Sequence, residues 1–281
     1  DSKSWVDFCS YVSRMPDSYI PLDGTLTFSN TKTTKQDYAS KRLPYPLAQM
    51  SYDAWEEIVS TLYEPIEREK IEWAIGAIIA GDAKSIQKFM VLYGSGGSGK
   101  STILRVIDKL FKGYKVTFEA KALTSNNNQF STAAFKNNAL VAINDDADLS
   151  RIEDNTKLNS MVSHEEILIN EKNKPAYTAR VNAFLFMGSN KPVKITDAKF
   201  GLIRRLIDVR PSGRHIPTAR YHELMKQIDF ELGGIAHHCL EVYKAMGKEY
   251  FSDYRPVDMM MKTDVFFNFI EAHFDIFKLQ D

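Results

Sequence analysis

Apolar residues follow two different spacings along the chain, and the spacing changes near residue 89. From residue 52 to residue 80 they recur every three or four positions, with Pro65 dividing the stretch into two amphipathic helices. Five short strand candidates, most of them apolar, follow at residues 89–93, 115–118, 140–143, 183–188 and 206–209. Runs of this length are typical of buried strands. Their alternation with helical or polar stretches predicts a mostly parallel sheet covered by helices.

The flanking segments predict three regions. Residues 22–28 have the pattern of a hairpin, and residues 41–46 that of an extended connector. Beyond Pro217 the pattern is helical. We therefore expect an α/β fold with three parts: a small mixed lead-in and helical collar over residues 1–84, a core over 85–212 and a helical C-terminal region over 213–281.

A glycine loop directly follows the first predicted strand of the core, and residues 102–111 after it have helical periodicity. Its spacing, G-x-x-x-x-G-K-S, is that of a P-loop, in which backbone N–H groups surround the phosphates of a nucleoside triphosphate, here ATP. We expect Lys100 to meet the β- and γ-phosphates and Ser101 to hold Mg²⁺. The predicted nucleotide-binding residues are Gly94, Ser95, Gly96, Gly97, Ser98, Gly99, Lys100, Ser101 and Thr102.

Polar side chains end two of the later strands. Asp145 and Asp146 follow the apolar run at 140–143, and we assign Asp145 to Mg²⁺ and Asp146 to activation of the attacking water, with their order left open. Asn190 ends the run at 183–188, where its amide can bind the γ-phosphate or the water. The alternative is that the aspartates form a solvated turn or helix cap and Asn190 an ordinary turn.

Two adjacent arginines, Arg204 and Arg205, precede the last predicted strand. A guanidinium there could reach the γ-phosphate of a neighbouring subunit and stabilise charge in the transition state, which would make the active site shared. Arg205 is slightly favoured for this role. The alternative is a pair of arginines in surface ion pairs.

Residues 167–181 contain two alternating runs joined by a polar, basic tip, which predicts a hairpin that projects from the core. Lys172, Asn173 and Lys174 form this tip and could contact the phosphates of single-stranded DNA. The alternative is a solvated turn. The whole chain has 36 Lys and Arg against 36 Asp and Glu, so its net charge is zero. DNA binding therefore requires a local cluster, or one cluster repeated around an oligomer.

The remaining composition is that of an ordinary globular protein. No apolar run is long enough to cross a bilayer, and the first residues lack the pattern of a signal peptide, so we expect a soluble, intracellular protein that is not secreted. Its start, at Asp1, favours a piece of a longer polypeptide. Cys9 and Cys239 are far apart and predict no disulfide framework, in keeping with a reducing compartment. His237, His238 and Cys239 diverge on a helix and predict no metal site.

Taken in order and spacing, the motifs between residues 89 and 209 resemble those of the superfamily 3 helicases, above all the phage and poxvirus-type primase-helicases. Papillomavirus helicases offer a local likeness in three places: the Asp145-Asp146-Ala147 motif, the basic tip followed by Pro175, and a strand that ends in Ser189-Asn190. Many relatives have Glu where this chain has Asp146 and His where it has Asn173. The phage-type lead-in is similar to residues 41–45.

The resemblance implies an AAA+ domain that forms a hexamer, with Mg²⁺-ATP sites between subunits and translocation on single-stranded DNA during genome replication in the host cytoplasm. It also implies an upstream primase or primase-polymerase domain. Two alternatives remain: an AAA+ loader or assembly ATPase that does not unwind DNA, and a P-loop kinase that transfers phosphate to a small acceptor. Subunit number, direction, nucleotide preference and origin specificity do not follow from the sequence.

Overall fold

The computed structural model of the chain describes residues 2–14, 26–35, 39, 41–124, 131–149, 154–193, 200–263, 269–270 and 273. The helices are α1 Ser2–Arg14, α2 Asp53–Leu62, α3 Pro65–Ile79, η1 Ala83–Ser85, α4 Lys100–Leu110, α5 Ala120–Leu123, η2 Ala133–Lys136, α6 Thr156–Val162, α7 Phe200–Ile203, α8 Thr218–Met246 and α9 Val257–Thr263, where η marks a 3₁₀ helix. The strands are β1 Thr27–Phe28, β2 Arg42–Leu43, β3 Phe89–Tyr93, β4 Lys115–Thr117, β5 Val141–Asn144, β6 Glu166–Ile169, β7 Tyr177–Arg180, β8 Phe184–Ser189 and β9 Leu206–Val209.

The five strand candidates form one sheet in the order β4-β5-β8-β3-β9, and every neighbouring pair is parallel. All residues of β3, β8 and β9 are buried, because helices cover both faces, and Ser189 and Asp208 are the polar residues among them. The prediction of an α/β fold with a parallel sheet is therefore confirmed. Because β8 lies between β3 and β5, it brings the end of a third strand between the glycine loop and the acidic pair.

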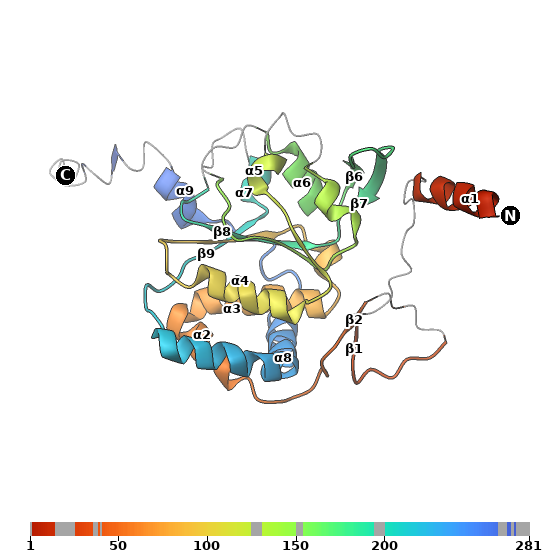
Figure 1. The fold of residues 1–281 in the computed structure, drawn as a ribbon. Coiled ribbons are helices and arrows are strands. Elements are labelled where there is room, and N and C mark those ends of the chain that lie inside the picture. The colour runs from red at the N-terminus through yellow and green to blue at the C-terminus, as the bar shows by residue number, and fades with distance from the viewer. Residues whose placement is uncertain are drawn as a thin grey trace.

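Helices cover the two faces of the sheet in separate layers. In Figure 1, α2, α3, α4 and α8 lie below the sheet, and α5, α6 and α7 lie above it. The buried apolar side chains accordingly form two clusters, one that includes Trp55, Ile75 and Ile107 and one that includes Leu158 and Leu185. The helices α2 and α3, predicted as a collar, thus share a core with the sheet, while the division into three regions stays a prediction.

Close approaches hold the lower layer together. A Cβ added to Gly76 of α3 would lie 2.1 Å from the backbone oxygen of Cys239, so only glycine lets α3 and α8 approach this closely. The carboxylate of Glu231, buried in α8, accepts hydrogen bonds from the backbone N–H groups of Ala54 and Trp55. It thereby caps α2, which has no side-chain cap of its own. Pro65 begins α3 after a connection of two residues from the end of α2, as predicted.

The lead-in differs from its prediction. Thr27 and Phe28 of β1 pair in parallel with β2, Arg42–Leu43, rather than in a hairpin, and the earlier part of residues 22–28 lies outside the described residues. The connector is fixed to the end of α4, because Tyr45 Oη donates to Leu110 O at 3.0 Å. The pairing of β1 with β2 joins segments 15 positions apart, and the turn pattern within residues 22–28 does not predict it.

Candidate active site

The glycine loop joins β3 to α4 at the carboxyl end of the sheet. Gly97 and Gly99 have φ values of 77° and 96°, a left-handed conformation that glycine adopts without a steric penalty. The backbone N–H of Gly94 donates to Ser189 O at 3.1 Å and attaches the start of the loop to β8. The loop therefore ends at the N-terminus of α4, where free N–H groups and the helix dipole favour an anion.

Lys100 lies at the centre of this loop and is buried. Its ammonium group donates to the backbone oxygens of Gly94 and Ser95 at 2.7 and 2.8 Å, and to Asn190 Oδ1 at 3.1 Å. Burial lowers the pKa of Lys100, whereas the negative charges of Asp145 and Asp146 oppose this effect. The lysine is thus held over the loop by oxygen atoms that a phosphate could replace.

Ser101 and Asp145 meet beside the lysine, with Ser101 Oγ donating to Asp145 Oδ1 at 2.8 Å. A hydroxyl and a carboxylate are oxygen ligands of the kind that Mg²⁺ prefers, and Mg²⁺ usually takes only one or two carboxylates together with substrate phosphates. The pair therefore fits the predicted Mg²⁺ site. Gly188 lies close behind it: an added Cβ would be 2.7 Å from Asp145 O, a constraint that the sequence pattern did not reveal.

The remaining predicted groups come from the two strands next to β3. Asp146 is exposed and follows β5, and Asn190 is exposed and follows β8. The acidic turn is attached to β8 by a hydrogen bond from Ala147 N to Gly188 O at 2.7 Å. The glycine loop, the acidic pair and the amide are thus brought together at one end of three adjacent strands.

A cleft of about 230 Å³ lies beside the glycine loop. It is lined by residues 97–102 and by Leu62, His215, Ile216 and Tyr221. Tyr221 belongs to α8, and its hydroxyl accepts a hydrogen bond from Arg105 at 3.0 Å. Sequence analysis missed this cleft, because its apolar and ring side chains lie far from the loop in the chain and match no motif.

The two arginines lie at the opposite, amino end of the sheet, immediately before β9. Arg205 is buried, and its guanidinium donates to Gly201 O at 2.6 Å and to Ser163 Oγ at 2.6 and 3.0 Å. Burial, and then the charge of Arg204, lowers the pKa of Arg205. The donors of Arg205 are therefore used inside its own subunit, whereas Arg204 is exposed.

The predicted basic hairpin is confirmed as the antiparallel pair β6–β7. Figure 1 shows it projecting from the layer that contains α5 and α6. Asn173 has a φ of 64°, which produces the tight turn, and Lys172 is exposed. Lys174 lies 3.4 Å from Glu171, which also accepts a hydrogen bond from Lys136 at 3.1 Å. The tip therefore carries net positive charge, with one acid held between two lysines.

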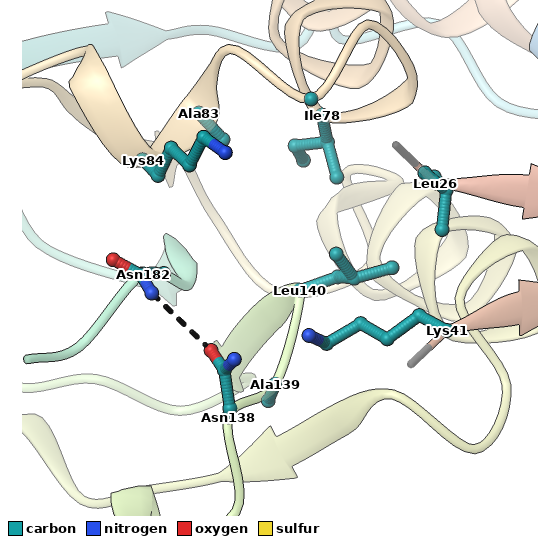
Figure 2. Close-up of a pocket in the computed structure, with 10 residues that line it drawn as sticks. Leu26, Lys41, Ile78, Ala83, Lys84, Asn138, Ala139, Leu140 and Asn182 are labelled. Atoms are coloured by element: carbon teal, nitrogen blue, oxygen red, sulfur yellow. Dashed lines mark hydrogen bonds between the residues drawn. The ribbon is translucent and has the colours of Figure 1, made fainter. Parts of the chain in front are cut away.

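Figure 2 shows another pocket, of about 70 Å³, at the amino ends of β5 and β8. Leu26, Ile78 and Leu140 form its apolar side, and Lys41 and Lys84 extend along its edge. Asn182 Nδ2 donates to Asn138 Oδ1 at 3.4 Å across the base of the pocket. The pocket lies away from the glycine loop and contains none of the predicted site residues.

Two further results concern metals and membranes. Within the described residues, no group of three or more His, Cys, Asp or Glu side chains is arranged to hold a metal ion. His238 instead makes a 3.0 Å contact with Glu72 Oε1, and Cys239 is fully buried. In the same part of the chain, no helix has both the length and the apolar character required to cross a bilayer.

Comparison with known proteins gives one partial family match. The model of a family of unknown function, DUF5906, matches residues 92–205, which include the glycine loop, the acidic pair, Asn190 and both arginines. The match ends at Arg205. It therefore covers every predicted catalytic group and assigns none of them a role.

Solved structures of the C-terminal region of NrS-1 share the fold. The A-form apo structure of this region is 15% identical with a TM-score of 0.58, over 95% of this chain and 67% of that one. A second apo structure, of residues 305–718, is 15% identical with a TM-score of 0.54, over 84% and 62%. An A-form apo structure of the same segment is 16% identical with a TM-score of 0.54, over 93% and 68%. At this identity the likeness concerns the fold alone.

Proposed function

We propose that this chain is an ATP-driven motor that moves along single-stranded DNA, the helicase part of a larger primase-helicase of the superfamily 3, AAA+ type. The observation that carries the proposal is the convergence of Lys100, Ser101–Asp145 and Asn190 at the carboxyl ends of three adjacent parallel strands. Ligands in open parallel sheets bind at this end, and a P-loop, an acidic pair and an amide are the groups that phosphoryl transfer to water requires.

In the proposed reaction, backbone N–H groups of the loop bind the β- and γ-phosphates, and Lys100 exchanges its carbonyl partners for phosphate oxygens. Ser101 and Asp145 would hold Mg²⁺, which would supply positive charge to the phosphates when bound. Asn190 orients a water molecule toward the γ-phosphorus, and Asp146 accepts its proton. The water oxygen forms a bond to the γ-phosphorus as the bond to the β–γ bridging oxygen breaks, leaving ADP and phosphate.

The cleft beside the loop supplies a place for the nucleoside. Leu62, Ile216 and Tyr221 offer apolar and ring surfaces next to the phosphate loop, and cofactor sites of this kind are mostly apolar with a few polar groups. ATP would therefore lie with its phosphates on the loop and its base toward α8.

The arginine pair supports a shared site. β3 has five residues, so the amino and carboxyl ends of the sheet are separated by roughly 16 Å at about 3.3 Å per residue. Arg204 lies at the amino end and cannot reach the glycine loop of its own subunit. In a ring, here a homo-hexamer, the exposed Arg204 would instead act on the triphosphate of a second copy.

The hairpin tip supplies the contact with DNA. Lys172 and Lys174 would bind backbone phosphates of single-stranded DNA, and repetition around a ring would produce a positive channel in a chain of zero net charge. Intracellular replication of a viral, phage or plasmid genome is the setting that this role implies. The alternative of a loader that remodels partners without unwinding shares the same ATP site.

The test is ATP hydrolysis with and without single-stranded DNA, in the intact chain and in Lys172→Ala/Lys174→Ala. DNA should raise turnover, and the variant should lose this stimulation while it keeps its basal rate. A matched control is Lys226→Ala/Lys244→Ala, which removes two exposed lysines from α8 and should behave like the intact chain. Hydrolysis that ignores DNA in all three proteins would contradict the motor. A DNA-stimulated ATPase that displaces no strand would favour the loader.

A further inference from the structure

A second, larger pocket of about 360 Å³ lies at the amino ends of β3 and β9, across the sheet from the glycine loop. Four parts of the chain contribute to it: Trp73 of α3 and residues from the segments 85–88, 204–205 and 248–255. Its charged lining residues are Lys88, Arg204, Arg205, Lys248, Arg255 and Glu249. Five positive side chains thus surround one cavity against a single carboxylate, in a chain with no net charge.

Within the described part of the chain, the five cations of this pocket lie around one cavity without a carboxylate paired to any of them. Elsewhere, arginines such as Arg68 and Arg220 form ion pairs with glutamates. None of the ion pairs between described residues joins a carboxylate to a cation of this pocket. Repulsion among like charges in a partly dry site is costly unless an anion compensates it. The pocket therefore has the charge pattern of an anion site.

Neutral groups hold the buried cations in place. Lys88 is buried, and its ammonium donates to the backbone oxygens of Arg204 at 2.6 Å and Ser252 at 3.1 Å. Arg205 is bonded to a serine hydroxyl and a backbone oxygen. Carbonyl and hydroxyl oxygens orient these groups without forming an ion pair, and the charges of Asp253 and Glu165 offset only part of the positive charge of Lys88 and Arg205. Burial, and then the charge of Arg255, lowers the pKa of Lys88 to about 8, as expected where positive charge is concentrated.

The remaining cations are exposed. Arg204, Lys248 and Arg255 line the pocket with exposed side chains, and Arg255 Nη1 donates to Tyr254 O at 2.9 Å. The wall behind them is fixed, because Trp73 packs against Phe251 edge to face with ring centroids 4.9 Å apart. A ligand would thus meet movable guanidinium and ammonium donors in front of a rigid, positively charged base.

We propose that this pocket binds a phosphate group. Guanidinium groups bind phosphate oxygens in a bidentate manner, and several cations around one cavity match a group with more than one negative charge better than they match a single carboxylate. The phosphate can come from a free phosphate compound or from a triphosphate on the glycine loop of a second copy of this chain. The second source rests on the proposed function, whereas the first does not.

The first experiment tests the pocket alone. Inorganic triphosphate is titrated by calorimetry into the Lys100→Ala chain, whose glycine loop no longer has its lysine, with and without Lys248→Ala/Arg255→Ala. Loss of two charge-assisted contacts should weaken binding by at least about tenfold. Lys226→Ala/Lys244→Ala in the same background removes two charges outside the pocket and should change binding less than about twofold.

The second experiment identifies the source. A chain with Lys248→Ala/Arg255→Ala keeps its glycine loop, and a Lys100→Ala chain keeps its pocket. If the phosphate comes from a second copy, a mixture of the two should hydrolyse ATP at least about tenfold faster than either alone. If Lys248→Ala/Arg255→Ala weakens triphosphate binding in the first experiment but the mixture gains no activity, the pocket binds a free phosphate compound. If the pocket variant matches the control in both experiments, the proposal is wrong. An intact chain that hydrolyses no ATP would end the proposed function, and the calorimetry would still decide on the pocket.

Discussion

The ammonium of Lys100 lies 3.1 Å from Oδ1 of Asn190, although the two residues are 90 positions apart in the chain. This hydrogen bond joins the loop after β3 to the end of β8. We predict that both side chains contact the γ-phosphate. The fold brings them within hydrogen-bonding distance of each other, as that prediction requires. This contact supports the proposed role of Asn190 at the γ-phosphate.

Replacement of Asn190 should affect turnover more than nucleotide binding. Asn190→Ala removes a polar group that orients the water, and loss of one such group typically lowers kcat by about 100-fold or more. The affinity for ATP, measured with a fluorescent analogue, should change by less than about threefold because the loop is intact. Asn138→Ala, which removes an amide at the other end of the sheet, is the control. Equal kcat values for Asn190→Ala and the control would refute the assignment.

Gly188→Ala should disturb the acidic turn. The added Cβ would lie 2.7 Å from Asp145 O and 3.2 Å from Leu104 Cδ1, so backbone and side chain must shift. Overpacking of this kind costs about 1–3 kcal/mol in the free energy of unfolding, measurable by urea denaturation. Displacement of Asp145 should also weaken the Mg²⁺ dependence of hydrolysis. Gly96→Ala, whose Cβ meets no atom within 4 Å, should change stability by less than about 0.5 kcal/mol.

The two arginines should separate into a structural and a catalytic role. Arg205→Ala leaves Ser163 Oγ and Gly201 O without this donor in a partly buried place, and should lower the free energy of unfolding by roughly 1–3 kcal/mol. Arg204→Ala should leave stability within about 0.5 kcal/mol of the intact chain.

Arg204→Ala should instead lower ATP hydrolysis by about 1000-fold, as expected for an arginine that stabilises transition-state charge. Mixing it with Lys100→Ala should restore part of the activity, because each chain supplies the half of the site that the other lacks. Full activity in the unmixed Arg204→Ala chain would place this residue outside the reaction.

The pH dependence of stability should report the cationic pocket. Burial and Arg255, with a smaller contribution from Arg205, lower the pKa of Lys88 from 10.5 to about 8, and Asp253 opposes the shift. Between these two pH values the unfolded chain binds a proton at this position that the folded chain does not. The free energy of unfolding should therefore rise with pH above about 8, by at most about 1.4 kcal/mol per pH unit.

Guanidinium denaturation between pH 7 and pH 10 measures this effect in the intact chain and in Lys88→Met. Arg204, Lys248 and Glu249 also face the pocket, but they are common to both proteins, so their contributions cancel in the difference. Two curves that remain parallel across this range would show that Lys88 keeps its proton.

Much of the fold follows from local patterns in the chain. Strands β3 and β9 begin and end where their apolar runs do, and β6 and β7 pair as the alternation on either side of the basic tip predicts. Pro65 ends one helical pattern and begins the next. Such features depend on neighbouring residues and on periods of two or 3.6, which can be read directly from the sequence. The pairing of β1 with β2 was not predicted, because its partner lies outside residues 22–28, and most of the predicted hairpin lies outside the described residues.

Some features of the candidate site could be predicted from the sequence, and others depend on the tertiary structure. The sequence determined the identity and order of Lys100, Asp145 and Asn190, since each follows an apolar run within a few residues. Only the tertiary structure decided that Ser101 meets Asp145, that Arg205 is buried while Arg204 is exposed, and that Lys88 contacts Ser252. Those contacts join segments 44 to 164 positions apart. They depend on which strands become neighbours and on how helices pack over them, and local periodicity carries no information about either.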